Sequence, residues 1–244
     1  MQKKFKLKNL ILLLSLLIFT ACGNGGGTTP ENPDKPDPTD PVNEEKITIP
    51  DDLSTIATPL VKGGSFSDGV SFIYKGDNKI QGDVEDGAID DDIVSIIRGK
   101  VLDNDGNPIK GVRITINNHK KYGFTYTRAD GEFDIAVNGN NYYDVSYKKT
   151  GFITVQRKAK PKSNNFKVLN KIIMIPFSQK VTKIDLAKVS DLTIAKGDVV
   201  EDEDGKREAV LMFQPQTKVK AVLSDGSEVE LNNISVRALE MLSI

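Results

Sequence analysis

The chain has 244 residues, with 33 Lys and Arg against 34 Asp and Glu, a length that allows one or two domains. Without the first 21 residues, which carry four Lys and no acid, the balance becomes 29 to 34, and this net negative charge argues against nucleic acid as a partner. A single Cys excludes an internal disulfide, a single His excludes a multi-His metal site, and the lack of Trp disfavours a sugar-binding platform.

The N-terminus has the pattern of a bacterial export signal. A basic stretch at residues 3–8 precedes the apolar segment 10–19, which is too short to span a bilayer. The following Phe19-Thr20-Ala21-Cys22-Gly23 resembles a lipobox, in which the Cys is acylated and becomes the new N-terminus. We therefore predict a lipoprotein signal peptide at residues 1–21 and a membrane anchor at Cys22, with Gly23 favouring the outer membrane. An ordinary signal peptide is the alternative.

Residues 22–46 are predicted to form a disordered tether. Three consecutive Gly are followed by five Pro that are separated by Asp, Glu, Asn and Thr, and apolar periodicity is absent. Such a segment cannot bury a core, and its extended character suits a spacer off a membrane.

Residues 47–95 are expected to be an approach segment with one short strand at Ser71–Tyr74. An acidic group also lies here, formed by Glu85, Asp86, Asp90, Asp91 and Asp92. Its spacing lacks the register of a calcium loop, so a solvated acidic loop is the interpretation.

Residues 96–177 have the period-2 alternation of half-buried strands, with Val112, Ile114 and Ile116 as the apolar positions of one strand. Turn residues separate the strands: the Asp103–Pro108 cluster is one turn, and Asp130-Gly131 predicts a hairpin because Gly permits positive φ. Residues 166–175 are expected to form the last strand. The sequence therefore predicts a small antiparallel β-sandwich without a recognisable reaction centre.

Ten residues carry a family resemblance for this region. In chain order they are Gly99, Asp103, Gly106, Pro108, Gly111, Asp130, Gly131, Phe133, Gly151 and Phe152. Their order and spacing resemble the carboxypeptidase regulatory-like, transthyretin-like domain family. The resemblance implies a seven-stranded, non-catalytic β-sandwich in which these residues have structural roles.

Further segments extend the resemblance to larger proteins. Residues 72–81, 122–139, 156–157 and 172–176 look like the N-terminal region of bacterial Rhs (YD-repeat) proteins and of the related teneurins. In those proteins the sandwich precedes a large β-shell that encloses a C-terminal toxin or effector. The YD repeats themselves do not occur in these 244 residues. A free-standing lipoprotein and the front part of a longer Rhs-type protein are therefore both open.

Residues 178–244 are predicted to form a second, smaller β unit. Residues 181–192 are expected to be a connector, and Val210–Phe213 an apolar strand of the fully buried kind. A hairpin is predicted around Ser224–Ser227, with alternating strands on both sides. The predicted fold class is all-β: an antiparallel transthyretin-like or Ig-like β-sandwich plus this smaller unit, after a disordered tether.

The residue types favour contact over catalysis. We expect a non-enzymatic cell-envelope lipoprotein, with no cofactor or metal, whose sandwich has a structural or protein-interaction role toward a protein or surface partner. The basic groups at 148–149 and 157–160 are expected to be a solvated face or a weak site for an anionic partner, and His119 a solvated side chain. The alternative is a surface carbohydrate-binding module that uses exposed tyrosines. Its candidates are Tyr122, Tyr126, Tyr142, Tyr143 and Tyr147.

Overall fold

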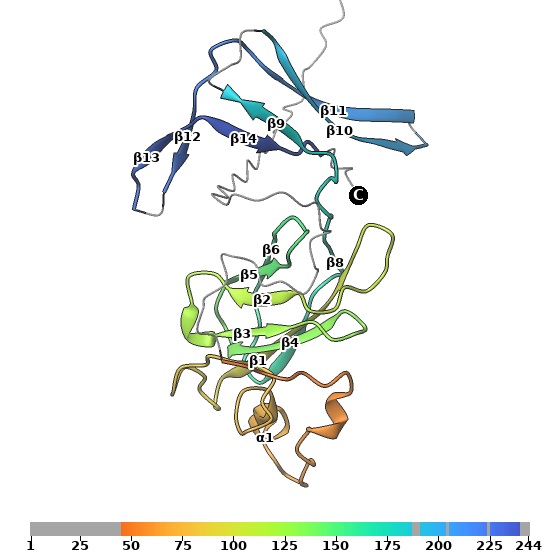
Figure 1. Cartoon of the computed structure of the whole chain (residues 1–244). Helices are drawn as coiled ribbons and strands as arrows, with labels where there is room; N and C mark the ends of the chain where they lie inside the picture. Colours follow the sequence, from red (N-terminus) through yellow and green to blue (C-terminus); the bar gives the residue numbers. More distant parts are fainter. Residues whose placement is uncertain (1–44, 187–190, 204, 224, 240–244) are drawn as a thin grey trace, which may run out of the picture. The chain divides into compact units, whose positions relative to one another are not determined.

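The computed structural model describes residues 45–186, 191–203, 205–223 and 225–239. The predicted signal peptide, the acylation site Cys22 and all but the end of the predicted tether lie outside these residues. The chain forms two compact units, which meet in the sequence between Phe177 and Ser178. Both units are drawn in Figure 1.

The N-terminal unit is an all-β sandwich, as predicted. One sheet has the order β4-β1-β7, with β8 also paired to β1; its strands are β1 (Val94–Leu102), β4 (Glu132–Asn138), β7 (Asn165–Val168) and β8 (Ile172–Ile173). The other sheet has the order β3-β2-β5-β6, from β2 (Arg113–Ile116), β3 (Phe124–Tyr126), β5 (Tyr143–Lys148) and β6 (Val155–Ala159) (Figure 1). All pairings in the second sheet are antiparallel.

The single last strand expected at residues 166–175 is instead two short strands, β7 and β8, and both run parallel to β1. The reason lies in the connection from β6. The chain crosses at residues 160–164 from the edge of one sheet to the edge of the other, so it returns in the direction of β1. Strand order of this kind depends on long-range pairing, which local alternation does not encode.

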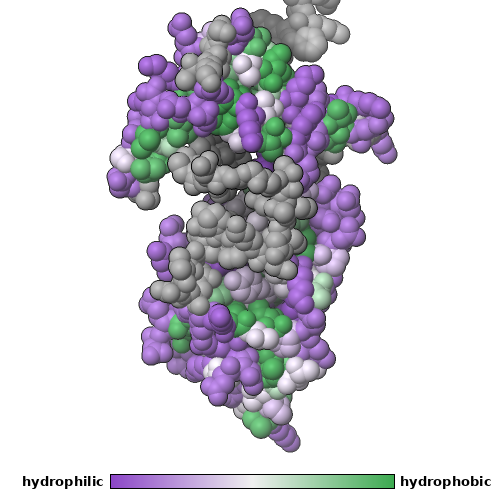
Figure 2. Space-filling model, viewed as in Figure 1, coloured by the Kyte–Doolittle hydropathy of each residue, from purple (hydrophilic) through white to green (hydrophobic). Residues whose placement is uncertain are grey.

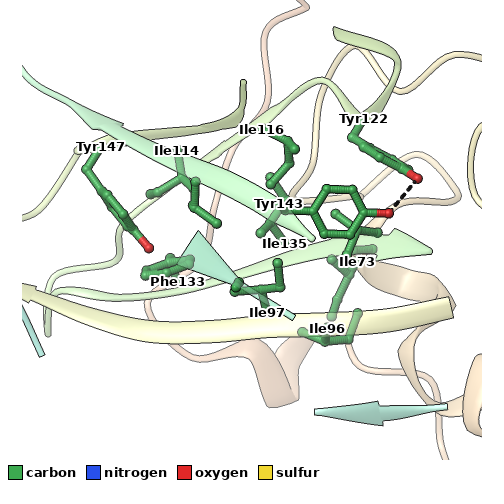
Figure 3. Close-up of a cluster of buried hydrophobic side chains, with 14 of the residues drawn as sticks. Ile73, Ile96, Ile97, Ile114, Ile116, Tyr122, Phe133, Ile135, Tyr143 and Tyr147 are labelled. Atoms are coloured by element: carbon green, nitrogen blue, oxygen red, sulfur yellow. Dashed lines mark hydrogen bonds between the residues drawn. The ribbon is translucent and has the colours of Figure 1, made fainter. Parts of the chain in front are cut away.

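The core lies between the two sheets. Ile97 and Ile135 lie opposite each other on β1 and β4, and both are fully buried, as is Ile114 from the other sheet (Figure 3). Tyr147 packs edge-on against Phe133, with ring centroids 5.5 Å apart. Most residues of β1 and β4 are buried on both faces, so the alternation predicted for this region holds in β2 but not in β1 or β4.

The segment before β1 packs into the same core. It contains η1 (Leu53–Thr55), α1 (Phe66–Val70) and η2 (Ser71–Ile73). The strand expected at Ser71–Tyr74 is therefore wrong. Ser65 and Asp68 form a capping box, in which each side chain accepts from the other residue's backbone N–H, and this starts a helical turn that continues into η2. Helical winding places Ile73 and Tyr74 in the sandwich core.

Two predicted turns have different outcomes. At Asp103–Pro108, the Asp103 carboxylate accepts from the backbone of Asn107 at 2.8 Å, and Gly106 has φ +85°, as a turn requires. Gly131 also has positive φ, +78°, but its turn joins β3 to β4, which belong to different sheets. The expected hairpin is wrong because β3 pairs with β2, whereas β4 pairs with the long central β1.

The remaining element of this unit is η3 (Lys120–Tyr122). Its last residue, Tyr122, is buried, and the Tyr122 hydroxyl lies 3.1 Å from the hydroxyl of the buried Tyr143 (Figure 3). The Tyr143 hydroxyl also donates to the carbonyl of Asn138 at 2.7 Å. These bonds satisfy phenol groups that burial would otherwise penalise.

The C-terminal unit consists of short antiparallel pairs. Its strands are β9 (Thr182–Asp185), β10 (Thr193–Asp202), β11 (Gly205–Phe213), β12 (Val219–Val222), β13 (Glu228–Leu231) and β14 (Asn233–Val236). β10 pairs with β11, β12 with β13, and β14 with β9. The predicted hairpin corresponds to β12 and β13, with Gly226 at φ +83° in the turn. A small core contains Ile184, Ala195, Leu231, Ile234 and Val236.

Two expectations for this unit are wrong. The expected connector contains β9, because Ile184 faces Ile234 of β14 across a strand pair and both are buried. The expected fully buried strand is half of a two-stranded ribbon, so only one of its faces has a layer to pack against. Met212 on the outer face is 64% exposed, opposite Ile194. Figure 2 shows several hydrophobic patches on this unit.

Candidate interaction surface at the β6 edge

The sandwich covers the sheet edges formed by β3 and β4. Gly82 and Phe124 exchange two backbone hydrogen bonds, of 2.9 and 3.0 Å, which close the outer edge of β3. The fully buried Gln81 side chain acts on β4: its Oε1 accepts from Ala136 N at 2.6 Å, and its Nε2 donates to Ala136 O at 2.9 Å. The same Nε2 donates to Tyr122 O at 2.8 Å. These bonds engage outward-facing backbone groups of Phe124 on β3 and of Ala136 on β4.

The edge formed by β6 is open. Among the strands that the structure describes, β6 is the last of its sheet and pairs with β5 alone (Figure 1). The Asp144 carbonyl accepts from Asn117 N, so the backbone N–H and C=O groups of Asp144 point toward β2. Because these groups alternate in direction along a strand, those of the next residue, Val145, point toward β6, and those of its partner Arg157 point toward β5. The backbone groups of Gln156 and Lys158 therefore point away from the sheet. In agreement, Arg157 Nη1 donates to Gln156 O at 2.9 Å from outside the ladder.

The open stretch has defined ends. Before β6, the Ile153 backbone N–H donates to Ile175 O at 2.9 Å, and after it Asn140 N donates to Pro161 O at 2.7 Å. The side chain of Asn140 also bonds Ser163, at 2.9 Å. The flanks are thus held by the sandwich itself, and the free edge is limited to the five residues of β6, a length of about 17 Å.

This edge is strongly basic. Residues 145–177 contain eight Lys and Arg and no Asp or Glu. Four exposed members, Arg157, Lys158, Lys160 and Lys162, lie on β6 or directly after it, and we call them the basic edge. Asp144, opposite Lys158 on β5, is the carboxylate that faces this strand. Among the described residues no ion pair within 4 Å engages Arg157, Lys158 or Lys162. Lys148 and Lys149, also expected in a basic face, are half-buried at the end of β5.

Tyr142 adds an aromatic ring beside the basic edge. It is 72% exposed, and Lys160 Nζ donates to its hydroxyl at 3.0 Å and lies 4.3 Å from its ring centroid. The hydrogen bond and charge of Lys160 lower the pKa of Tyr142. By contrast Tyr143 and Tyr147 are buried, and desolvation raises the pKa of both hydroxyls. Of the five tyrosines considered for a sugar platform, Tyr142 alone is exposed, so a multi-ring platform is not present in the described part of the chain.

The buried charges of the sandwich are occupied by one another. Asp134 has no solvent exposure; its Oδ1 accepts from Arg98 Nε at 2.6 Å and its Oδ2 from Arg128 Nη1 at 2.9 Å. Arg128 also contacts Glu132 at 3.2 Å. A carboxylate that is enclosed and paired on both oxygens has no position for a substrate, so this cluster is a structural ion network.

The residues of the family motif lie in turns and at close approaches. Gly99 faces the Phe133 ring, and a Cβ there would lie 2.8 Å from the ring edge. Asp130 accepts from the backbone of Glu132 at 2.8 Å, within the turn of Gly131. The others lie in turns or beside them: Asp103, Gly106, Pro108, Gly111, Gly151 and Phe152, the last of which packs against the core. The structure does not gather these ten residues into one site.

The remaining candidates are dispersed. Asp91 is held by Lys75 and by the Tyr74 hydroxyl, which donates at 2.8 Å, and these contacts lower the pKa of Asp91. His119 is half-buried, with its ring 5.4 Å from that of Tyr143. Within the described ranges, no three His, Cys, Asp or Glu side chains are placed to hold a metal ion, and no helix has the length and apolar character to cross a bilayer.

Sequence reasoning missed Gln81 and Arg128. Gln81 lies in a segment without alternation, and its partners are 41 and 55 residues away. Arg128 precedes the Asp130-Gly131 turn and looks like any surface charge of a loop. The position of Gln81 between Ile80 and Gly82 was the one local sign that its side chain could be buried and bonded to the backbone of another strand.

Comparison with known proteins identifies the sandwich. Residues 89–174 match the family model described as "Teneurin TTR-like domain". This part of the N-terminal unit is similar to the transthyretin-like domain of teneurins. This confirms the resemblance to transthyretin-like and teneurin sequences noted above, and it extends over the sandwich.

The relatives are much longer than this chain. Teneurin-3 of Danio rerio is 30% identical over 149 residues, which is 60% of this chain and 6% of that protein. Teneurin-3 of Mus musculus is 24% identical over 185 residues, or 74% of this chain and 7% of that protein. Among solved structures, the Bacillus anthracis TIE protein aligns over 61% of this chain and 32% of that one, with 15% identity and a TM-score of 0.32, too low to bear on fold or function. The chain thus spans under a tenth of these teneurins.

Proposed function

We propose that the chain is a cell-envelope lipoprotein, and that its transthyretin-like unit is a protein-interaction module at the front of an Rhs-type assembly. The observation that carries the interaction role is the β6 edge. One side of the sandwich is closed by Gln81 and Gly82, whereas the other presents a free, charged strand. The match to a teneurin TTR-like domain supports a structural or interaction role for this unit.

The chemistry of the acidic side chains supports contact rather than catalysis. Asp134 is paired with two Arg, Asp103 accepts backbone hydrogen bonds in its turn, and Asp91 is bound by a Lys and a Tyr. Each of these carboxylates completes a local structure. A hydrolase of the two-carboxylate kind would need a pair about 5 to 9 Å apart that faces a substrate cleft.

The envelope location rests on the sequence of the first 22 residues and is tested at Cys22. Because this is the single Cys of the chain, incorporation of a clickable fatty acid reports acylation there. We expect the wild-type protein to be labelled and to pellet with the envelope, and Cys22→Ser to lose both properties. Ala21→Gly, which keeps a small residue before the Cys, is the matched control and should behave as wild type. A Cys22→Ser protein that still pellets with the envelope would contradict the lipid anchor.

The Rhs part of the proposal is tested in the native cell. An antibody to the sandwich should detect either a band somewhat below 26.8 kDa, the mass of these 244 residues, or a much larger one. A larger band, or YD repeats in frame downstream, would place this chain at the front of an Rhs-type shell. The small band without such a frame would refute the Rhs assignment and retain the lipoprotein.

A further inference from the structure

The β6 edge has the backbone geometry for one additional strand. The N–H and C=O groups of Gln156 and Lys158 point outward, and the ladder to β5 satisfies the inward set. Within the described part of the chain, Gln156 O accepts from the exposed side chain of Arg157 alone, and a peptide could displace this bond. An extended peptide that aligns here would therefore gain backbone hydrogen bonds at two positions without disturbing the sheet.

The charge of this edge selects among strands. A second copy of β6 would place Lys and Arg opposite Lys and Arg, which is unfavourable in a strand pair, so the edge resists self-association. A strand with acidic side chains at two adjacent positions would meet Lys158 on one face and Arg157 on the other, because successive side chains of a strand point to opposite faces. Lys158 thus disfavours pairing between two copies of β6 and favours pairing with a strand of opposite charge.

We infer that the β6 edge binds an extended, acidic polypeptide segment of a partner protein, which adds to the β3-β2-β5-β6 sheet as a fifth strand. This inference rests on the proposed interaction function and names the chemical class of the partner. Lys160 and Lys162 continue the basic edge beyond β6 and would contact acidic residues that follow the added strand. Asp144, which faces Lys158, weakens the attraction on the outer face, so Arg157 and Lys158 are both needed.

Peptide binding to the purified full chain tests the inference. The probe is a fluorescein-labelled ten-residue peptide in which pairs of Glu alternate with pairs of Val or Thr, so that Glu side chains lie on both faces of the strand, and its anisotropy reports binding. Two matched peptides separate charge from backbone: one replaces every Glu by Gln, and the other keeps every Glu but carries an N-methyl group on each backbone amide, which blocks both of its edges. We expect binding of the first peptide only, because strand addition needs both the charges and the N–H groups.

Variants of the chain test the location. Lys158→Glu should weaken binding roughly ten- to thirty-fold, since an attractive cross-strand pair becomes repulsive. Lys62→Glu, at an exposed Lys before α1, is the matched control and should change the affinity by less than about twofold. Gln156→Pro removes an outward N–H that has no partner in the ladder, so the strand pair can remain while peptide binding is lost; Gln156→Ala keeps the N–H and should still bind.

Folding is checked independently of binding. All six tyrosines of the chain lie in the N-terminal unit, so near-ultraviolet circular dichroism of tyrosine reports the sandwich alone. A variant with an altered spectrum is replaced by the double variant Arg157→Gln, Lys158→Gln, which changes charge and leaves the backbone intact.

Four results would overturn the inference. Equal binding of the N-methylated peptide would show attraction without strand addition. Equal binding by Lys158→Glu would place the site elsewhere. Binding of duplex DNA or of anionic vesicles, but not of the peptide, would assign the basic edge to another class of anion. Loss of peptide binding in a chain that is still acylated and pellets with the envelope would refute the acidic partner and leave the proposed location standing.

Discussion

Replacing Gln81 by Leu should destabilise the sandwich severely, although Gln81 lies outside every strand of the unit. The side chain is fully buried and makes three hydrogen bonds to main-chain groups of Ala136 and Tyr122, between 2.6 and 2.9 Å. Leu has a similar volume and fills the space, so cavity formation contributes little. The loss comes from one N–H and two C=O groups that would remain buried without partners.

The magnitude follows from these three groups. Each unsatisfied buried group costs about 1–2 kcal/mol, so the free energy of unfolding should fall by roughly 3–6 kcal/mol. A small domain has a total of about 5–15 kcal/mol, so this change removes a large part of it. With a urea m-value of about 2 kcal/mol per molar, the midpoint should move down by roughly 1.5–3 M. Tyrosine circular dichroism follows this transition, because the C-terminal unit contains no Tyr.

The control is the same substitution at a surface position. Gln156→Leu on the exposed edge of β6 should change the free energy of unfolding by no more than about 0.5 kcal/mol. If Gln81→Leu shifts the midpoint as little as Gln156→Leu does, the side chain does not cap β4. The hydrogen bonds from Gln81 to β4 would then contribute little to the stability of the sandwich.

Three further predictions concern the sandwich. Gly99→Ala should lower stability by about 1–3 kcal/mol in urea denaturation, because the new methyl group would lie 2.8 Å from the Phe133 ring; an unchanged midpoint would mean that the ring moves freely. Asp134→Asn should lower the free energy of unfolding by about 3 kcal/mol in the same assay, which is at the low end for breaking a buried ion pair because one partner, Arg98, reaches solvent. A change below about 1 kcal/mol would show that the ion network does not stabilise the sandwich. In a titration followed at 295 nm, the phenol of Tyr142 should ionise at a lower pH in the wild-type chain than in Lys160→Leu, because Lys160 stabilises the phenolate and lowers the pKa of Tyr142. Tyr142→Phe should remove this ionisation altogether. An early step that is unchanged in either variant would refute the pairing.

The sequence alone was sufficient where the signal is local. Glycines at positive φ, such as Gly106 and Gly131, mark turns because the residue type itself permits the conformation. The alternation in β2 and the hairpin of β12 and β13 could be predicted for the same reason. The family motif could be recognised because its residues occupy these turns and a close approach at Gly99.

Local signals failed where distant segments decide the outcome. Residues 71–74 have the composition of a strand, but a capping box upstream starts a helical turn. Val210 and Met212 belong to an apolar run that looks buried, yet a two-stranded ribbon has only one covered face.

The sequence by itself determined the fold class, the turns and the basic character of residues 145–177, since each follows from residue type and short-range spacing. The tertiary structure decided which edges of the sandwich are closed. Gln81 seals β4 from 55 residues away, and the crossing from β6 to β7 leaves β6 without a neighbour on its outer side. The physical reason is that a strand's free hydrogen-bonding groups depend on its neighbours in space, and those neighbours are set by the packing of the whole unit.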